Sequence, residues 1–171
     1  MINVVDTETT GFDPKDGGVC EIACVNVGSH PEFTEDSFMH TLVNPGFPIG
    51  FEAMGTHHIT DDMVSAAFTL DQVILDYGLI VHDVWAAHNA EFDKSFLPEE
   101  IRAKRWICTW RCAMHLWPEA PSHRNQALRY WLGLDVSDMP AEAGGNAHRA
   151  LYDAWVTAKL LRRLMDEVKH T

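Results

Sequence analysis

The order of the apolar runs constrains the fold of this chain more than any other feature. Three runs rich in β-branched and apolar residues come first, at residues 2–6, 19–27 and about 37–43. Turn-forming segments bound them, including Asp13-Pro14-Lys15-Asp16-Gly17-Gly18 and Asn44-Pro45-Gly46. Runs of this composition between such boundaries are typical of β-strands. Three strands in succession predict an antiparallel meander.

The rest of the chain alternates between strand-like and helical segments. Residues 84–88 and 106–108 have the composition of short buried strands. Helices are expected to start at a capping Thr60, to run from a capping Thr69 to about Tyr77, and to run from a capping Asn89 to Pro98. Three further helices are expected: one that ends near Trp117-Pro118, one from Arg124 to Trp131 before Gly133, and one from about His148 to Val168. Three strands followed by strands that alternate with helices predict one α/β domain with a mixed β-sheet flanked by helices.

Length and composition are those of an ordinary globular domain. Of the 171 residues, 46% are apolar and 22% are charged. Apolar runs such as Leu79–Val81 are far shorter than the roughly 20 residues that cross a bilayer. The first residues lack a basic segment followed by an apolar stretch, so we expect no signal peptide and a cytoplasmic protein without a membrane partner.

The cysteines at positions 20, 24, 108 and 112 suit a reduced intracellular protein, although their paired spacing also suggests a structural zinc site. Cys20 and Cys24 lie in a predicted strand. Four strand residues separate their sulfurs by roughly 13 Å, whereas Zn–S bonds are about 2.3 Å long. We therefore expect small buried side chains rather than zinc ligands.

The net charge of −12 gives no support for nucleic-acid binding by overall charge, because phosphates are usually bound by a basic face. The 13 Lys and Arg residues are unevenly distributed, however. Seven of them fall within one central stretch: Lys94, Arg102, Lys104, Arg105, Arg111, Arg124 and Arg129. A local basic surface is one interpretation, and an acidic surface without a special partner is the other.

Asp6 and Glu8 are the first candidate functional residues. They lie in Val4-Val5-Asp6-Thr7-Glu8-Thr9-Thr10-Gly11, and residues i and i+2 of a strand point to the same face. Two carboxylates this close repel each other unless a cation neutralises them, and carboxylate oxygens suit Mg²⁺ or Mn²⁺. The alternative is an exposed edge strand with ordinary surface acids.

Three further candidates come later in the chain. Asp93 follows the expected cap Asn89 by one turn, where an acid on a helix surface is the ordinary interpretation. Asp153 lies among apolar helical residues, and burying it is costly unless it is paired or binds metal. His148 stands five residues earlier, which is about 140° around a helix. It reaches the same site only from a non-helical lead-in, which the Gly144-Gly145-Asn146 segment allows, and otherwise has a surface or capping role.

Together and in this order, these residues resemble the DnaQ-like DEDD family of 3′→5′ exonucleases. Asp6 and Glu8 match the first motif, Asp93 the second, and His148 with Asp153 the third. The histidine subclass (DEDDh) has this spacing, whereas the tyrosine subclass carries Tyr where this chain has Arg149. Residues 56–60, Thr-His-His-Ile-Thr, resemble the family's His-x-Ile-Thr segment, so the resemblance covers nearly the whole chain.

The resemblance implies a ribonuclease-H-like fold, a single exonuclease domain over residues 1–171, and hydrolysis with two Mg²⁺ or Mn²⁺ ions. Asp6, Glu8 and Asp153 would bind one ion, with Asp6 also at the second, and Asp93 would support the second through water. His148 would be the general base. The terminal nucleotide would lie against Thr9, Thr10, Gly11, His57 and Asn89.

The partner implied is the 3′ end of DNA, single-stranded or frayed duplex, cleaved to nucleoside 5′-monophosphates. Exoribonuclease activity of the same family is the nearest alternative, because no motif detects a 2′-hydroxyl. A proofreading subunit beside a polymerase and a non-catalytic nucleic-acid-binding module are the others. The oligomeric state stays open.

Overall fold

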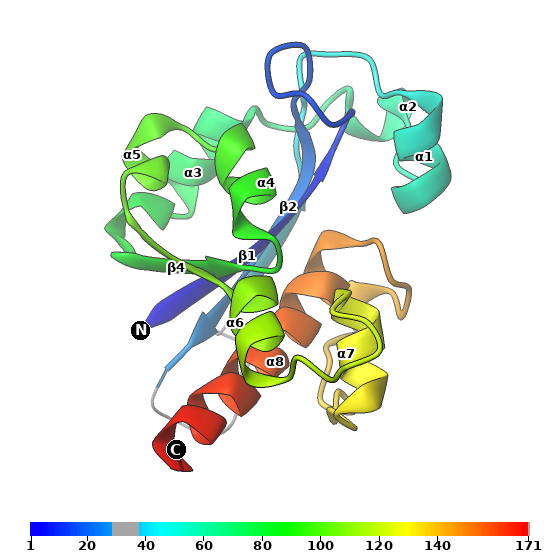
Figure 1. The fold of residues 1–171 in the computed structure, drawn as a ribbon. Helices are drawn as coiled ribbons and strands as arrows, with labels where there is room; N and C mark the ends of the chain where they lie inside the picture. Colours follow the sequence, from blue (N-terminus) through cyan, green and yellow to red (C-terminus); the bar gives the residue numbers. More distant parts are fainter. Residues whose placement is uncertain (29–37, 171) are drawn as a thin grey trace.

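A computed structural model describes residues 1–28 and 38–170 of the chain (Figure 1). Its sheet contains β1 (Ile2–Thr9), β2 (Val19–Val27), β3 (Phe38–Leu42), β4 (Val84–Ala87) and β5 (Arg105–Cys108). All five were expected from the sequence. Ser37, the first residue of the third predicted strand, lies outside the described residues.

The sheet is mixed, with the strand order β3-β2-β1-β4-β5. β1 pairs antiparallel with β2 and β2 pairs antiparallel with β3, which confirms the predicted meander. β4 pairs parallel with β1 and with β5, because helical crossovers precede each of the two later strands. β1 is therefore the central strand, and its carboxyl end lies between elements from both halves of the chain.

The helices flank this sheet. They are α1 (Phe51–His57), α2 (Asp61–Val64), α3 (Leu70–Asp76), α4 (Ala90–Phe96), α5 (Glu99–Arg102), α6 (Thr109–Leu116), α7 (Asn125–Trp131) and α8 (Ala150–His170), with 3₁₀ turns η2 (Leu79–Val81) and η3 (Ala141–Ala143). The predictions did not include α1, whose seven residues contain a glycine, or α5, which has four residues and gives no clear helical period. Among the described residues, no helix has both the length and the apolarity to cross a membrane.

The predicted helix caps are correct only in part. Thr69 and Gln72 form a capping box at the start of α3, as expected from a threonine at that position. Thr60 precedes α2 but makes no capping hydrogen bond through its side chain. The capping prediction for Asn89 is wrong as well: its φ of 68° is left-handed, whereas a capping side chain needs extended backbone.

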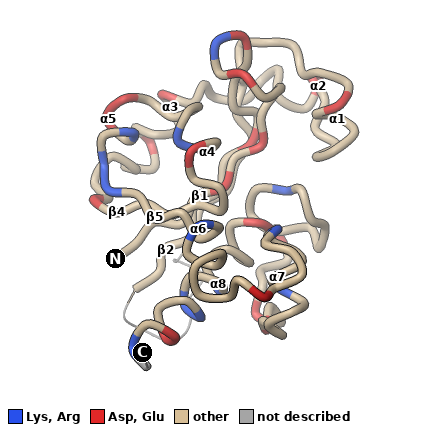
Figure 2. Tube along the Cα trace, in the orientation of Figure 1, with Lys and Arg blue, Asp and Glu red and all other residues tan. Residues whose placement is uncertain are grey.

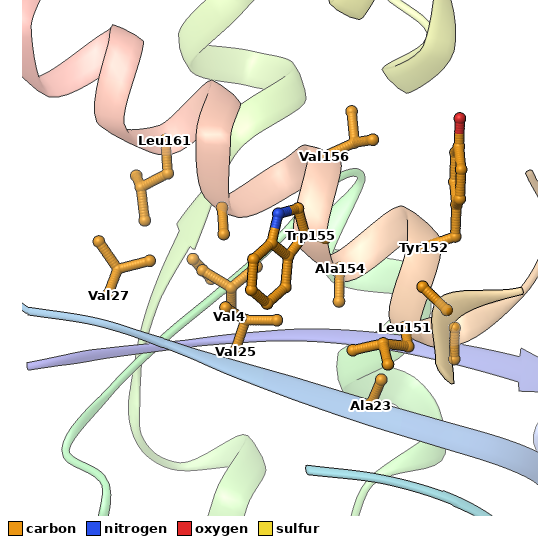
Figure 3. Close-up of a cluster of buried hydrophobic side chains, with 14 residues drawn as sticks. Val4, Ala23, Val25, Val27, Leu151, Tyr152, Ala154, Trp155, Val156 and Leu161 are labelled. Carbon is orange, nitrogen blue, oxygen red and sulfur yellow. The ribbon is translucent and has the colours of Figure 1, made fainter. Parts of the chain in front are cut away.

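Two apolar clusters, one on each face of the sheet, set the direction of every β1 side chain. Val4 packs with Ala23, Val25 and α8 residues such as Leu151 on one face (Figure 3). Val5 packs on the other face with side chains from α3, α4 and α5. Because strand side chains alternate, Asp6 and Glu8 lie on the α8 face with Val4, and Thr7 lies on the α4 face with Val5.

Candidate functional site

The structure brings three predicted carboxylates together on the α8 face of the sheet. Asp6 and Glu8 come from β1, and Asp153 comes from the first turn of α8. One carboxylate oxygen from each residue lies within 4.8 Å of the others, and we call this group the carboxylate cluster. In Figure 2, acidic segments lie along β1 and β2 in the middle of the molecule. The three ligand atoms are all oxygens, and this donor set fits a hard divalent cation.

The electrostatics of the cluster favour a cation as well. Burial and then the neighbouring carboxylates raise the pKa of Asp6 well above its ordinary value. The same causes, burial first and Asp153 second, raise the pKa of Glu8 to about 8. Arg149 opposes this shift without cancelling it. Three acids that resist ionisation together are stabilised when positive charge binds among them.

The raised pKa of Glu8 predicts that wild type and Glu8→Gln differ in stability in EDTA, and that this difference depends on pH. The folded-state pKa of Glu8, about 8, lies above its ordinary value of 4.5, so the folded protein holds this proton more tightly than the unfolded chain. Glu8 therefore destabilises the fold progressively as pH rises from about 4.5 to about 8. Urea unfolding should show Glu8→Gln gaining stability relative to wild type over that range. A difference independent of pH would contradict the shift.

Asp93 approaches β1 from the opposite face. Its Oδ1 accepts hydrogen bonds from the Thr7 backbone N–H at 3.0 Å and from the Thr7 hydroxyl at 2.9 Å. Burial raises the pKa of Asp93 to about 7, although these hydrogen bonds lower it. Its charge in turn raises the pKa of Asp6. Asp93 thus lies near the carboxylate cluster without joining the three oxygens that define it.

Asp153 is oriented by two donors. Its Oδ2 accepts from the backbone N–H of His148 at 2.8 Å, and its Oδ1 accepts from Nε2 of Gln126, in α7, at 2.5 Å. Gln126 was not predicted as a site residue, because a glutamine on a half-exposed helix carries no local signal. Such outer contacts fix the direction in which a ligand carboxylate points.

His148 lies before α8, as the predicted non-helical lead-in requires. Its φ is 62°, an uncommon conformation for a residue other than glycine. Its side chain is exposed, and no hydrogen bond joins the imidazole to any described residue. Burial raises the pKa of Asp153, and a positive charge on the His148 imidazole opposes this shift, so the ring lies near this carboxylate.

A cavity of about 660 Å³ opens beside the carboxylate cluster, within the size range of small-ligand sites. The end of β1, α1 and α4 line it, and four of the predicted nucleotide-binding residues are among the lining: Thr9, Thr10, Gly11 and His57. Asn89 is not among the described residues that line it. Phe12, Phe51 and Phe92, which the sequence analysis did not select, do line it. Another cavity, of about 360 Å³ between α6 and α8, has no acidic lining.

His57 supports the wall of the larger cavity from behind. Its Nδ1 accepts from the Ile59 backbone N–H at 3.0 Å, so Nε2 carries the proton and donates to the Thr9 carbonyl at 3.3 Å. Burial lowers the pKa of His57, which keeps the ring neutral. The ring is almost fully buried and joins the end of α1 to the end of β1.

Glu21 is another residue that the sequence analysis did not select. It lies opposite Glu8 in the β1–β2 register, with its side chain fully buried and paired with Arg149. Within Val19–Val27 it is the one acid, and Asn26 is the one other polar residue of the strand. An isolated acid in a mostly apolar strand was the sequence feature that could have identified Glu21.

Comparison with known proteins agrees with these motifs. A family model described as "Exonuclease" matches residues 4–161. Exodeoxyribonuclease 10 of Escherichia coli K12 is 39% identical over 166 residues, which cover 97% of this chain and 69% of the relative. A PolC-type DNA polymerase III of Bacillus subtilis is 31% identical over 173 residues, which cover 96% of this chain and 11% of that protein.

The solved structures give the same result. An exonuclease X in complex with 5′ overhanging duplex DNA superposes with a TM-score of 0.84 at 38% identity, covering 98% of this chain and 92% of that chain. This confirms the likeness to exodeoxyribonuclease X that residues 106–109, 116–118 and 148–153 predict. The nuclease domain of a DEDDh-family 3′-exonuclease bound to rAMP, 19% identical with a TM-score of 0.73, covers 97% of this chain and 92% of that chain. It confirms the ribonuclease-H-like fold.

Proposed function

The chain belongs to the exonuclease family and is a 3′→5′ exonuclease, and we propose that its substrate is the 3′ end of DNA, single-stranded or frayed from a duplex. A relative 39% identical over 97% of this chain is an exodeoxyribonuclease. The solved structure with the TM-score of 0.84 contains DNA. Both support DNA over RNA as the substrate.

One observation carries the proposed site: Glu8 belongs both to the carboxylate cluster and to the wall of the 660 Å³ cavity. A terminal nucleotide in this cavity therefore has its phosphodiester beside the three carboxylates. A site arranged in this way removes one nucleotide from the end of a strand, because the cavity holds the terminal nucleotide that is released.

The residues of the cluster fit the binding of two Mg²⁺ or Mn²⁺ ions. Asp6, Glu8 and Asp153 would hold one ion, and Asp6 would share the second with Asp93. When bound, such ions stabilise the attacking and the leaving oxygens of an in-line displacement. Gln126 and the His148 backbone N–H keep Asp153 directed at the cluster.

His148 is the general base in this proposal. It takes a proton from the water that attacks phosphorus, the P–O3′ bond breaks, and O3′ remains on the preceding nucleotide, protonated from solvent. The product is a nucleoside 5′-monophosphate. Histidine is the side chain that most often transfers protons in enzyme active sites. The exposed position of the ring allows it to reach an incoming water.

Local positive charge reconciles the net charge of −12 with a polyanionic substrate. Lys94 on α4 and Arg111 on α6 form no ion pair with a described residue, and Figure 2 shows basic segments on both helices. We propose that both side chains bind backbone phosphates of the substrate.

Replacing Phe51 by alanine should weaken DNA binding without affecting the chemical step. Phe51 begins α1 at the cavity and is 90% exposed, so its removal costs the fold little. Stacking of a base on an aromatic ring contributes about 1–3 kcal/mol, which corresponds to a KM raised by roughly 5- to 150-fold at unchanged kcat.

The control is Phe68→Ala, which removes another exposed phenylalanine outside the cavity. It should leave KM for single-stranded DNA at the wild-type value. If Phe51→Ala also leaves KM unchanged, Phe51 has no part in the binding surface.

The proposed function is tested with 5′-labelled single-stranded DNA and RNA of the same sequence, with Mg²⁺ or with EDTA. We expect a metal-dependent ladder that shortens the DNA from its 3′ end. Faster shortening of RNA would establish the exoribonuclease alternative instead. No cleavage of either strand, with Mn²⁺ binding demonstrated by calorimetry, would favour a non-catalytic binding module.

A further inference from the structure

Glu21 is a charged residue inside the sheet that the proposed mechanism leaves without a task. Its side chain is fully buried on β2. Because Ala23 and Val25 of the same strand face α8, Glu21 faces α8 as well. It is also the cross-strand partner of Glu8, so the two carboxylates lie on one face of the sheet. A buried carboxylate beside a group of acids requires specific compensation.

Four donor groups from three residues supply that compensation. Arg149 donates from Nε at 3.1 Å and from Nη2 at 2.5 Å. The Ala150 backbone N–H donates at 2.8 Å, and Nε2 of His40 lies 2.7 Å from Oε1. Burial alone would raise the pKa of Glu21, but hydrogen bonds from His40, Arg149 and Ala150 lower it to about 2. Glu21 is therefore an anion, and most of its partners belong to one short segment.

That segment is the turn through which the chain enters α8. His148 precedes Arg149 and Ala150 directly, and its φ of 62° is a conformation that a residue with a side chain adopts only under constraint. The His148 N–H is held by Asp153, and the two residues that follow are held by Glu21. The turn is thus fixed from both sides by acids on different elements.

The imidazole itself has no such support. No hydrogen bond to a described residue holds the exposed ring of His148, so the backbone turn sets the point from which the ring extends. A change that releases Arg149 and Ala150 from β2 removes one of the two supports of this turn and leaves only the contact between the His148 N–H and Asp153.

We propose that Glu21 is a positioning residue that acts through His148, by fixing the turn before α8 so that the imidazole stays beside the carboxylate cluster. The inference rests on the proposed function, in which His148 is the general base. Glu21 touches neither substrate nor the reacting atoms in this role. Its effect on the rate passes through the histidine.

A double-mutant cycle tests this role. Glu21→Gln keeps the size of the side chain, but its amide group presents N–H where Arg149 and Ala150 need an acceptor. We expect kcat on 5′-labelled single-stranded DNA to fall by about 10- to 100-fold, the usual effect of an outer contact. In a His148→Ala background the same substitution should change kcat by less than about threefold, because a residue that acts through another has no effect in its absence.

Each variant is assayed in single turnover at saturating Mn²⁺, with saturation established by calorimetry, so that a changed metal affinity does not enter kcat. Glu99→Gln, which breaks only the exposed ion pair with Arg102, is the control and should match wild type. Equal losses from Glu21→Gln in both backgrounds would overturn the inference, because they would show an effect independent of His148.

A second variant covers the case in which Glu21→Gln does not fold, as judged by circular dichroism. Arg149→Lys keeps the positive charge but loses the two-pronged contact with Glu21. The same cycle with His148→Ala is then expected to show the same dependence. If wild type itself cleaves neither DNA nor RNA, the proposed function fails; if it cleaves and the cycle is additive, only the role of Glu21 fails.

Discussion

Replacing Asp6 by asparagine should reduce kcat by at least about 10³-fold while leaving the protein folded. Asp6 lies in the carboxylate cluster, and the charges of Asp93, Asp153 and Glu8 act on it. The loss of its charge removes a ligand common to both proposed ions. Metal stabilisation of a transition state amounts to several kcal/mol, and each 1.36 kcal/mol corresponds to a tenfold change in rate.

The same substitution should raise the melting temperature of the protein in EDTA. Burial and then the neighbouring carboxylates raise the pKa of Asp6, so its charge is unfavourable when no cation is bound. Removing that charge relieves the repulsion without changing the shape of the side chain. Activity and stability thus change in opposite directions, which distinguishes a metal ligand from a structural acid.

Asp76→Asn, at an exposed position at the end of α3, is the matched control. It should retain wild-type activity on 5′-labelled DNA. Wild-type turnover by purified Asp6→Asn at saturating Mg²⁺ would refute the assignment of the carboxylate cluster as the catalytic metal site.

Replacing His148 by alanine should slow cleavage by about 10²- to 10⁴-fold, the usual contribution of general acid–base catalysis. The affinity for Mn²⁺ should stay close to that of the wild type, because the imidazole is not one of the three clustered ligand groups. Single-turnover kinetics at neutral pH measures the rate of cleavage, and calorimetry measures the affinity for Mn²⁺. His148→Asn should lose as much activity, since asparagine tolerates left-handed backbone but accepts no proton.

The chain offers a close control for this substitution. His58 is also an exposed histidine with left-handed backbone, at a φ of 60°, and it lies at the end of α1. His58→Ala therefore has the same change in composition and backbone strain. We expect it to be fully active. A rate near that of the wild type in His148→Ala would remove this histidine from the role of base.

The strands and the longer helices follow from local patterns of side chains. The alternation of side chains in β1 predicts that Asp6 and Glu8 share a face. The helical period of the apolar residues in α8 predicts that Asp153 lies among apolar neighbours. The resemblance to a family then assigns Asp93 and His148. α1 was not predicted, because seven residues that include a glycine give no clear helical period.

The supports of the site could not be predicted in this way. Thr7 and Asp93 are 86 residues apart in sequence, and Glu21 and Arg149 are 128 residues apart. No spacing rule connects such pairs, since they meet only when the sheet and α8 have packed. No spacing rule predicts the hydrogen bond from Gln126 to Asp153 or the position of Phe51 at the cavity either.

By itself, the sequence determined the strand order of the meander, the shared face of Asp6 and Glu8, and the need for a non-helical turn at His148. These depend on periods of two and 3.6 residues, which are properties of the backbone. Only the tertiary structure decided how far apart the carboxylates stand, which donors orient Asp153, and that a buried Glu21 holds the turn before α8. Those features depend on the packing of distant segments, whose geometry no local period contains.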